Sequence, residues 1–332
     1  MKTKTLAFAI LLLAVAFLSA SCFRLKVQLG GPSGEALKEY TIEGKGRQKV
    51  LVIPVTGFIS DKPGGRLAGS RPSAVEEVAS RLRLARESGD VKAVVFEVNS
   101  PGGSMTASDM IYKEIVDFKE KTGAKVVALF MDVAASGGYY VSLAADRIVA
   151  HPTTITGSIG VILVRPQVSG LMDKLGIAVD VSKSGSEKDI GSPFRPATPE
   201  ERKIFEDITD EMGRKFIDLV GRNRKIGREN LKKIATARIY TADEALRLGL
   251  VDSIGYVQDG VKEARKLAGL PEDARVVVYR REKYPDDTLY NTAAGAAGSS
   301  PFPPLVDINL PDILPPLEPG FYYLWLPGGS RG

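Results

Sequence analysis

The sequence predicts an α/β protein with a single layered domain, and two features of its middle part support this. Short apolar runs rich in β-branched residues, such as VLVIPV at 50–55, are typical of buried strands. They alternate with segments whose apolar residues recur at helical spacing, such as Ser73–Glu87. Strands that alternate with helices form a sheet with helices packed on it. No change in composition between residues 49 and 268 marks a second domain.

The remaining elements follow the same alternation. A long helix begins with Thr198, Pro199 and two glutamates. A Thr N-cap, a Pro at the first helical position and acidic residues in the first turn are a strong start signal. Glycine-containing turns at 99–104 and 132–138 each separate a strand from a helix. Beyond the two elements above, we expect strands at 92–98, 125–131, 147–151 and 178–185, and helices at 106–121, 138–145 and 198–224.

Three residue types occur once each: His151, Cys22 and Trp325. Zinc sites take several Cys or His ligands and a disulfide takes two Cys, so the sequence predicts neither. A Ser-His-Asp triad would have to use His151. The net charge of +5 comes from 45 basic and 40 acidic residues without a dense basic run. Nothing in the sequence therefore indicates nucleic-acid binding.

The N-terminal residues 1–22 have the pattern of a membrane-targeting segment. Two lysines precede an apolar run that is short for a spanning helix and fits a secretory signal. Cys22 follows small residues, as in a bacterial lipobox, although Ser19 stands where an aliphatic residue is usual. We expect either a lipid on Cys22 or an uncleaved signal anchor. Both place the domain at the extracytoplasmic face of a membrane, after a linker at 23–48.

The C-terminal residues differ in composition from the domain, which we expect to span 49–268 and to finish with a domain end at 269–292. Ala293–Ser300 consists of small residues and is a flexible linker. Pro301–Pro327 mixes Pro with large apolar residues and cannot form a core alone. We expect this Pro-rich tail, within 293–332, to dock on its own domain, a neighbouring subunit or a membrane, or to stay disordered.

Ser136 lies in the second of two glycine turns that each follow a predicted strand and open a helix. The first turn, Asn99–Ser104, has two adjacent glycines after Pro101, so its backbone can turn sharply and present bare N–H groups. In the second, Ala135 and Gly137 flank Ser136. A nucleophile needs such space for a substrate carbonyl, with the next N–H directed at its oxygen. Each turn alone is weak evidence, because glycine-rich turns also bind phosphates.

The combination of the two turns is more specific. VNSPGGSMTASDMIY followed by DVAASGGYY resembles the Clp-protease and crotonase superfamily. The segments HPTTITGSIGVI, SGSEKDIGSPFRPATPEER, FIDLVGRNR and ARIYTADEALRLGLVDSIG resemble signal peptide peptidase A, a serine peptidase family of bacterial membranes. The resemblance covers about residues 50–265 and implies a repeated ββα spiral and a hydrolase without cofactor or metal. A Clp protease would also have a catalytic His downstream of the serine, and this chain has none there.

A serine hydroxyl needs a neighbouring base, and the residues alone leave several candidates. His151 ends a predicted strand, where a boundary residue of any type would serve. The alternative is a lysine made neutral by burial, since desolvation disfavours the ammonium form. The resemblance points to Lys188 as the general base, and Lys183 is the second candidate. It also implies that Ser158 orients the lysine.

The resemblance further implies that backbone N–H groups of Gly137 and of Gly102 or Gly103 bind the oxyanion. Because the chain carries one copy of the motif set, it implies a homo-oligomeric ring in which Ser136 meets Lys188 of a neighbour. The implied activity is that of a membrane-associated serine endopeptidase degrading hydrophobic peptides such as cleaved signal peptides.

Two other functions are compatible with parts of the sequence. A crotonase-like enzyme would use the same N–H groups on an acyl-coenzyme A thioester, but the secretion signal counts against it. A catalytically silent lipoprotein would use the scaffold to bind peptides or membrane partners. The presence of both Ser136 and Lys188 counts against this second alternative.

Overall fold

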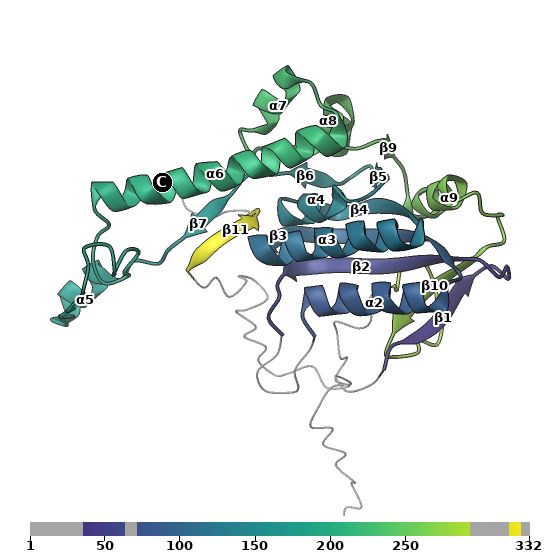
Figure 1. The fold of residues 1–332 in the computed structure, drawn as a ribbon, viewed down its shortest axis with the longest axis horizontal. Coiled ribbons are helices and arrows are strands. Elements are labelled where there is room, and N and C mark those ends of the chain that lie inside the picture. The colour runs from purple at the N-terminus through teal and green to yellow at the C-terminus, as the bar shows by residue number, and fades with distance from the viewer. Residues whose placement is uncertain (1–35, 64–71, 293–318, 327–332) are drawn as a thin grey trace, which may run out of the picture.

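A mixed β-sheet with helices on both faces forms the body of the protein (Figure 1). The computed structural model describes residues 36–63, 72–292 and 319–326. The main path through the sheet is β1-β10-β2-β3-β4-β5-β9, β6 joins β4 to β8, and β11 joins β3 to β7. The strands are β1 Lys38–Glu43, β2 Lys49–Ile59, β3 Val91–Ser104, β4 Lys125–Ala135, β5 Arg147–Ala150, β6 Ile155–Gly157, β7 Ile162–Val164, β8 Ile239–Thr241, β9 Ser253–Ile254, β10 Arg275–Arg280 and β11 Gly320–Leu324.

Helices α2, α3 and α4 cover one face of the sheet and α9 covers the other (Figure 1). Side chains alternate along a strand, so in β2 Leu51 and Ile53 pack toward α2 and α3 while Val50 and Val52 pack toward α9. Burial on both faces explains why the central strands appear as continuous apolar runs in the sequence. The helices are α2 Ala74–Ser88, α3 Met105–Thr122, α4 Gly137–Ser142, α5 Ser169–Leu175, α6 Pro199–Arg224, α7 Arg228–Ile234, α8 Ala242–Leu248 and α9 Val257–Leu267.

Capping residues mark the starts of helices α2 and α6. The Ser73 hydroxyl accepts a hydrogen bond from the Glu76 N–H at 3.1 Å, and the Glu76 carboxylate accepts one from the Ser73 N–H at 2.7 Å. Thr198 and Glu201 form the same reciprocal pair at the start of α6, with Pro199 at its first position. Each pair satisfies two backbone donors that the helix leaves free, so the predicted helices at 73–87 and 198–224 are confirmed.

Three segments differ from the sequence-based expectation. The sequence predicts turns at 99–104 and 132–138, but β3 continues to Ser104 and β4 to Ala135. Partners distant in sequence extend these strands: residues 102–104 pair with β11, and 133–135 pair with β6. The predicted strand at 178–185 is wrong, because this stretch is irregular and exposed. Its alternation of apolar residues resembles a strand, but no strand pairs with it in the described chain.

Both ends of the described chain contribute strands to the sheet. β1, which falls within the segment expected to be a linker, pairs antiparallel with β10. β11 pairs antiparallel with β3 and β7, so the described part of the tail docks on its own domain. Cys22 and the predicted targeting segment lie outside the described residues. No helix within the described ranges is both long enough and apolar enough to cross a membrane.

Candidate active site

Ser136 lies at a sharp connection between β4 and α4. Its φ of 52° and ψ of −112° fall outside the common conformations of a non-glycine residue. The Ser136 N–H donates to the Gly157 carbonyl at 2.8 Å, and the Ser136 carbonyl accepts from the Tyr140 N–H at 2.8 Å. These bonds fix the turn from both sides. Such strained backbone persists only where the surroundings hold it, and it clusters at functional sites.

The hydroxyl of Ser136 is buried and free of hydrogen bonds. The residue is 1% exposed, and its Oγ has no hydrogen-bond partner among the described residues. Leaving a buried polar group unpaired typically costs about 1–3 kcal/mol, so each such group in a protein calls for an explanation. A site that receives a partner from outside the described chain would explain it.

Ser158 lies directly beside Ser136. Strands β4 and β6 pair in parallel with Ala135 opposite Gly157, which places the two serines at the ends of neighbouring strands. Ser158 also has a positive φ of 50° and is 9% exposed. Its N–H donates to the Arg238 carbonyl at 2.9 Å. The structure therefore brings together two serines from the ends of different strands, both on strained backbone.

The glycines expected to bind an oxyanion surround the same point. Gly137 directly follows Ser136, and a Cβ on Gly102 would lie 2.7 Å from the Gly137 nitrogen. The Gly102 N–H is already occupied, because it donates to Ser100 Oγ at 3.1 Å. The Ser100 hydroxyl in turn donates to the Gly57 carbonyl at 2.6 Å. Gly103, the other glycine of this turn, lies in the sheet opposite Ile59 of β2 and Tyr323 of β11.

Lys188 is located on an arm that extends away from the body. The arm, residues 165–198, contains α5 and leads into the start of α6, at the end of α6 remote from α4 (Figure 1). Lys188 is exposed there, and its N–H donates to the Gly185 carbonyl at 3.2 Å. Within one chain the structure thus brings together Ser136, Ser158 and the glycines but leaves Lys188 outside this group.

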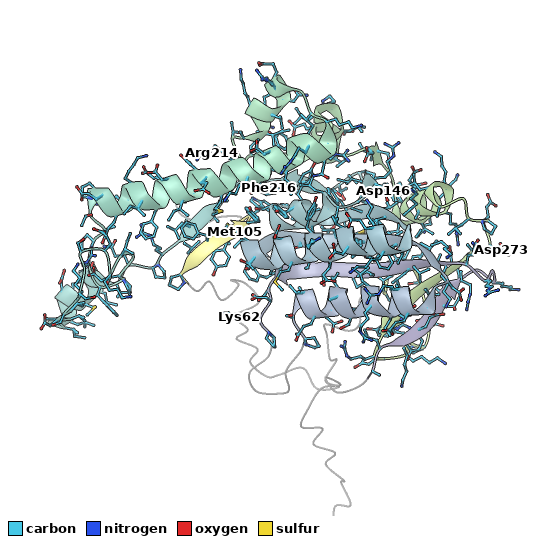
Figure 2. All side chains as sticks on the ribbon, viewed as in Figure 1. Lys62, Met105, Asp146, Arg214, Phe216 and Asp273 are labelled. Carbon is cyan, nitrogen blue, oxygen red and sulfur yellow. The ribbon has the colours of Figure 1, made fainter. Side chains whose placement is uncertain are left out.

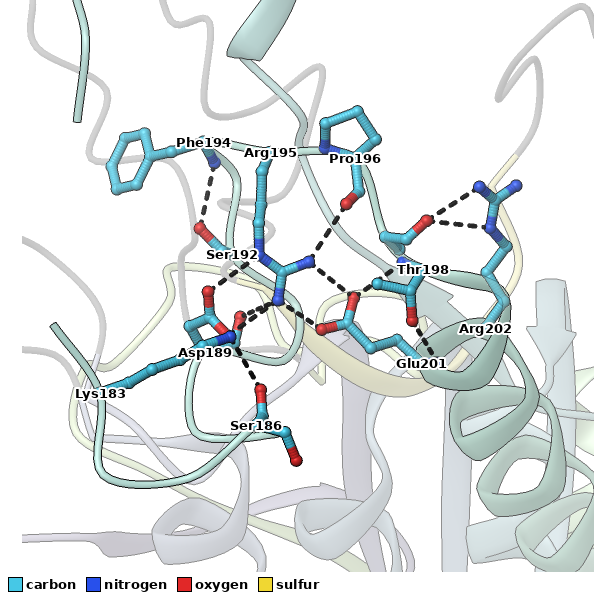
Figure 3. Close-up of polar contacts among 11 residues, drawn as sticks. Lys183, Ser186, Asp189, Ser192, Phe194, Arg195, Pro196, Thr198, Glu201 and Arg202 are labelled. Atoms are coloured by element: carbon cyan, nitrogen blue, oxygen red, sulfur yellow. Dashed lines mark hydrogen bonds and ion pairs between the residues drawn. The ribbon is translucent and has the colours of Figure 1, made fainter. Parts of the chain in front are cut away.

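A compact ion-pair network holds the arm in shape (Figure 3). The Arg195 guanidinium makes two hydrogen bonds to the Asp189 carboxylate, both 2.8 Å, and also binds Glu201 at the start of α6. Lys183 joins the network through its ammonium group, 2.7 Å from Asp189. Hydrogen bonds from Arg195 and Lys183 hold the pKa of Asp189 well below its usual range. The network fixes the loop that carries Lys188, and it occupies the ammonium group of Lys183.

His151 has other partners. Its Nδ1 lies 2.8 Å from the Thr153 hydroxyl, and its ring packs edge-on against Tyr256 with the centroids 5.1 Å apart. It lies just beyond β5, near β9, whose Ile254 pairs with Ala150. These contacts assign His151 a local structural role. Within the described part of the chain, no cluster of three or more His, Cys, Asp or Glu side chains could hold a metal ion.

The sequence does not point to several residues that line the site. Ser108 lies close to Gly137, because a Cβ there would come 2.5 Å from the Ser108 hydroxyl. Tyr140 donates a hydrogen bond to Asp109 at 2.7 Å. Phe216 lies on the side of α6 that faces α4 and β11 (Figure 2), and its ring contacts those of Tyr140 and Tyr323. For Tyr323, the sequence signal is the aromatic content of the tail, which does not indicate that this residue contacts the site.

The chain is similar in sequence to several known proteases. Residues 118–271 match the model of peptidase family S49, and residues 70–156 match that of Clp protease. A putative signal peptide peptidase SppA of Enterococcus faecium is 35% identical over 75% of this chain and 72% of its own length. A putative protease of Synechocystis is 37% identical over 68% of this chain and 77% of its own. Protease 4 of Haemophilus influenzae is 31% identical over 77% of this chain but only 40% of its own length.

Proposed function

The chain belongs to the signal peptide peptidase A family, peptidase family S49, with a Clp-protease-like fold, and on this premise we propose that it is a membrane-associated serine endopeptidase with Ser136 as nucleophile and Lys188 as general base. The observation that carries the proposal is the buried, unpartnered hydroxyl of Ser136 on a strained turn. Acyl transfer also requires donors for the oxyanion, and the N–H groups of the adjoining glycine turns supply them in this proposal.

In the proposed mechanism, neutral Lys188 accepts the proton of Ser136 while Oγ attacks the carbonyl carbon of a peptide bond. The N–H groups of Gly137 and of Gly102 or Gly103 donate hydrogen bonds to the developing oxyanion. The protonated lysine then gives its proton to the leaving amine as the C–N bond breaks, which leaves an acyl-enzyme. Water, deprotonated by the same lysine, hydrolyses the ester and restores Ser136. Ser158, beside Ser136, orients the lysine.

We propose that the lysine comes from a neighbouring copy of the chain in a homo-oligomeric ring. Three observations support this: Lys188 is exposed on an arm, Ser136 has no partner among the described residues, and the arm is rich in exposed apolar side chains. Burial of the amine next to Ser136 would favour its neutral form, because desolvation disfavours the ammonium ion. The exposed apolar residues of the arm are Leu171, Leu175, Ile177, Val179, Val181 and Phe194.

The proposed substrates are hydrophobic peptides, including signal peptides that remain after cleavage. The name of the Enterococcus relative, signal peptide peptidase, supports this substrate class. The apolar N-terminal segment and Cys22 support membrane attachment on the extracytoplasmic side, where such fragments arise. An enzyme held at that surface meets its substrates at a high local concentration.

The test is hydrolysis of a fluorogenic hydrophobic peptide by the full chain in detergent. Ser136→Ala and Lys188→Ala should each lower kcat by at least about 10³-fold. Lys174→Ala, an exposed lysine on the same arm, should retain the wild-type rate and serves as the matched control. Loss of activity with Lys183→Ala but not with Lys188→Ala would move the base to Lys183. A wild-type chain that hydrolyses nothing would indicate the catalytically silent scaffold.

Complementation tests the shared site. Inactive Ser136→Ala and Lys188→Ala chains, unfolded together and refolded as mixed oligomers, should regain activity, because some interfaces combine an intact serine with an intact lysine. Each variant refolded alone should stay inactive. If the mixture also stays inactive while mixed oligomers form, both residues act within one chain and the ring proposal is wrong.

A further inference from the structure

Strand β4 contains two extra residues near its C-terminal end. Val98 of β3 lies opposite Phe130 of β4. The next pair in the ladder is Ser100 opposite Ala134. One residue of β3 therefore faces three residues of β4, 131–133, which we call the β4 bulge. Bulges are common next to active sites, where they redirect a side chain.

The β4 bulge brings Ser136 level with the first glycine turn. With the bulge in place, a Cβ on Gly102 would lie 2.7 Å from the Gly137 nitrogen. In a ladder without the bulge, Ser100 would face Asp132, and Ser136 would lie two residues farther along the sheet. Two residues of a strand span about 6.6 Å. The serine and the glycine turn would then no longer meet.

The hydrophobic pattern of β4 does not fix this register. Val127 and Leu129 face α9, whereas Val126 and Ala128 face the helices on the opposite side of the sheet. Side chains alternate between the two faces with a period of two residues, so a shift of two residues leaves each side chain on its original face. Contacts made specifically with the β4 bulge are therefore needed to hold the register.

Asn99 of β3 supplies one such contact. It is the half-buried residue that faces the β4 bulge. Its side-chain oxygen accepts a hydrogen bond from the Val133 N–H at 3.1 Å. Among the described residues, none of β3 pairs with Val133 in the ladder, so the Asn99 side chain replaces the missing backbone partner. Backbone N–H groups inside a protein require such a partner.

Thr154 supplies a second contact, from the opposite edge of β4. Strand β4 pairs with β5 up to Phe130 and with β6 from Val133 onward. Thr154 lies in the connection between β5 and β6 and is fully buried. Its hydroxyl oxygen lies 2.5 Å from the Met131 carbonyl oxygen and 3.2 Å from that of Phe130. Asn99 and Thr154 thus bind the β4 bulge from its two sides.

We infer that Asn99 and Thr154 are positioning residues: they hold the β4 bulge in the register that places Ser136 against the glycine turn. They act through Ser136 rather than on the substrate. The inference rests on the proposed function, because it takes Ser136 as the nucleophile. A misplacement of about 1 Å costs about 10²-fold in rate, so a loosened bulge should lower kcat. KM should change little, because neither side chain is assigned a contact with the substrate.

Hydrolysis of the fluorogenic hydrophobic peptide by the full chain in detergent tests the inference. Thr154→Val replaces the hydroxyl with a methyl group and should lower kcat at least about tenfold, with KM within about twofold of wild type. Thr154→Ser keeps the hydroxyl and should retain kcat within about threefold. Thr122→Val is the matched control: the Thr122 hydroxyl donates to the Phe118 carbonyl at 2.7 Å, just before the opposite end of β4. This variant should keep the wild-type kcat.

Hydrogen exchange gives a second readout that does not depend on turnover. Asn99→Ala should lower kcat as Thr154→Val does. Both variants should also speed the exchange of residues 131–136, measured by mass spectrometry, at least about tenfold. Residues 125–130 should exchange as in the wild type, because they keep their ladder with β3 and β5. A general loss of stability would instead speed exchange along the whole strand.

The outcomes separate this inference from the peptidase proposal. Wild-type kcat in both Asn99→Ala and Thr154→Val would overturn the inference, and so would a fall in kcat that Thr122→Val shares. If Asn99→Ala does not fold, the comparison of Thr154→Val with Thr154→Ser decides. If the wild type hydrolyses no peptide, the peptidase proposal fails, and exchange decides whether the two side chains hold the bulge. Exchange that is unchanged, or faster along all of β4, would then overturn that role.

Discussion

Replacing Gly102 with alanine should abolish activity through a backbone collision. Gly102 has a φ of +105°, where an L-residue is strained. A Cβ there would lie 2.7 Å from the Gly137 nitrogen and 3.0 Å from the Tyr323 carbonyl carbon, and would collide with the Tyr323 oxygen. All three atoms belong to the backbone, so no side-chain rotation relieves the contact. The substitution should therefore push the substrate carbonyl away from the Gly137 N–H.

This geometry predicts a loss of stability and a loss of catalytic rate, which can be measured separately. The strained φ should lower the free energy of unfolding by about 1–2 kcal/mol. Losing one oxyanion donor should lower kcat by about 10²–10³-fold. Gly89→Ala is the matched control, because Gly89 has a φ of +67° at the end of α2 but open space where the Cβ would go. It should show the loss of stability without the loss of rate.

The assay combines chemical denaturation with peptide hydrolysis for the two variants and the wild type. Gly89→Ala should unfold at a lowered denaturant concentration and Gly102→Ala at a still lower one, because only Gly102→Ala adds a backbone collision to the strained φ; only Gly102→Ala should lose hydrolysis. A Gly102→Ala chain that hydrolyses peptide within threefold of the Gly89→Ala rate would contradict this prediction. In that case the glycine turn of β3 does not border the reacting carbonyl.

Three further predictions concern stability and the arm. Burial raises the pKa of Glu97, so its stabilising contribution is present below its unfolded pKa of about 4.3 and is lost as pH rises through the folded value. Glu97→Gln should therefore raise the unfolding free energy near pH 8 but not at pH 4. Ser73→Ala removes an N-cap and should cost about 1 kcal/mol in thermal unfolding without changing the hydrolysis rate. The lowered pKa of Asp189 means that the contribution of the arm network to stability is present above the unfolded pKa of about 3.9 and is lost as pH falls through the folded value. Arg195→Ala should lower, at neutral pH, the hydrogen-exchange protection factors of residues 183–198 relative to wild type.

Local signals in the sequence predicted the parts of the fold that depend on neighbouring residues. The capping residues of α2 and α6 act within one helical turn, so their starts could be predicted from Ser73 and Thr198. The small residues around Ser136 identified the connection between β4 and α4 for the same reason. The extension of β3 to Ser104 depends on pairing with the end of β2 and with β11, more than 200 residues later, and no local pattern encodes it.

In the candidate site, too, the residues in local turns were predictable from the sequence and the contacts between distant segments were not. Ser136 and the glycines occur in recognisable turns, and the structure brings them together with Ser158 through the β4–β6 pairing. The ring contacts of Tyr323 with Tyr140 and Phe216 were not predictable, because the three residues come from distant segments. The apolar alternation of 178–185 was misleading, since a strand requires a pairing partner as well as a pattern. Its valines at 179 and 181 are instead exposed on the arm.

Two features of Ser136 that lower the stability of the fold are also features that catalysis would require. The positive φ of Ser136 and its unpaired, buried hydroxyl are both unfavourable for the isolated chain. The paired strands β4 and β6 hold the turn through the bond from the Ser136 N–H to Gly157, so the turn cannot relax to satisfy the hydroxyl. A lysine amine delivered by the arm of a neighbouring chain would supply the missing partner and the missing base at once. Assembly and activation of the nucleophile would then be one event.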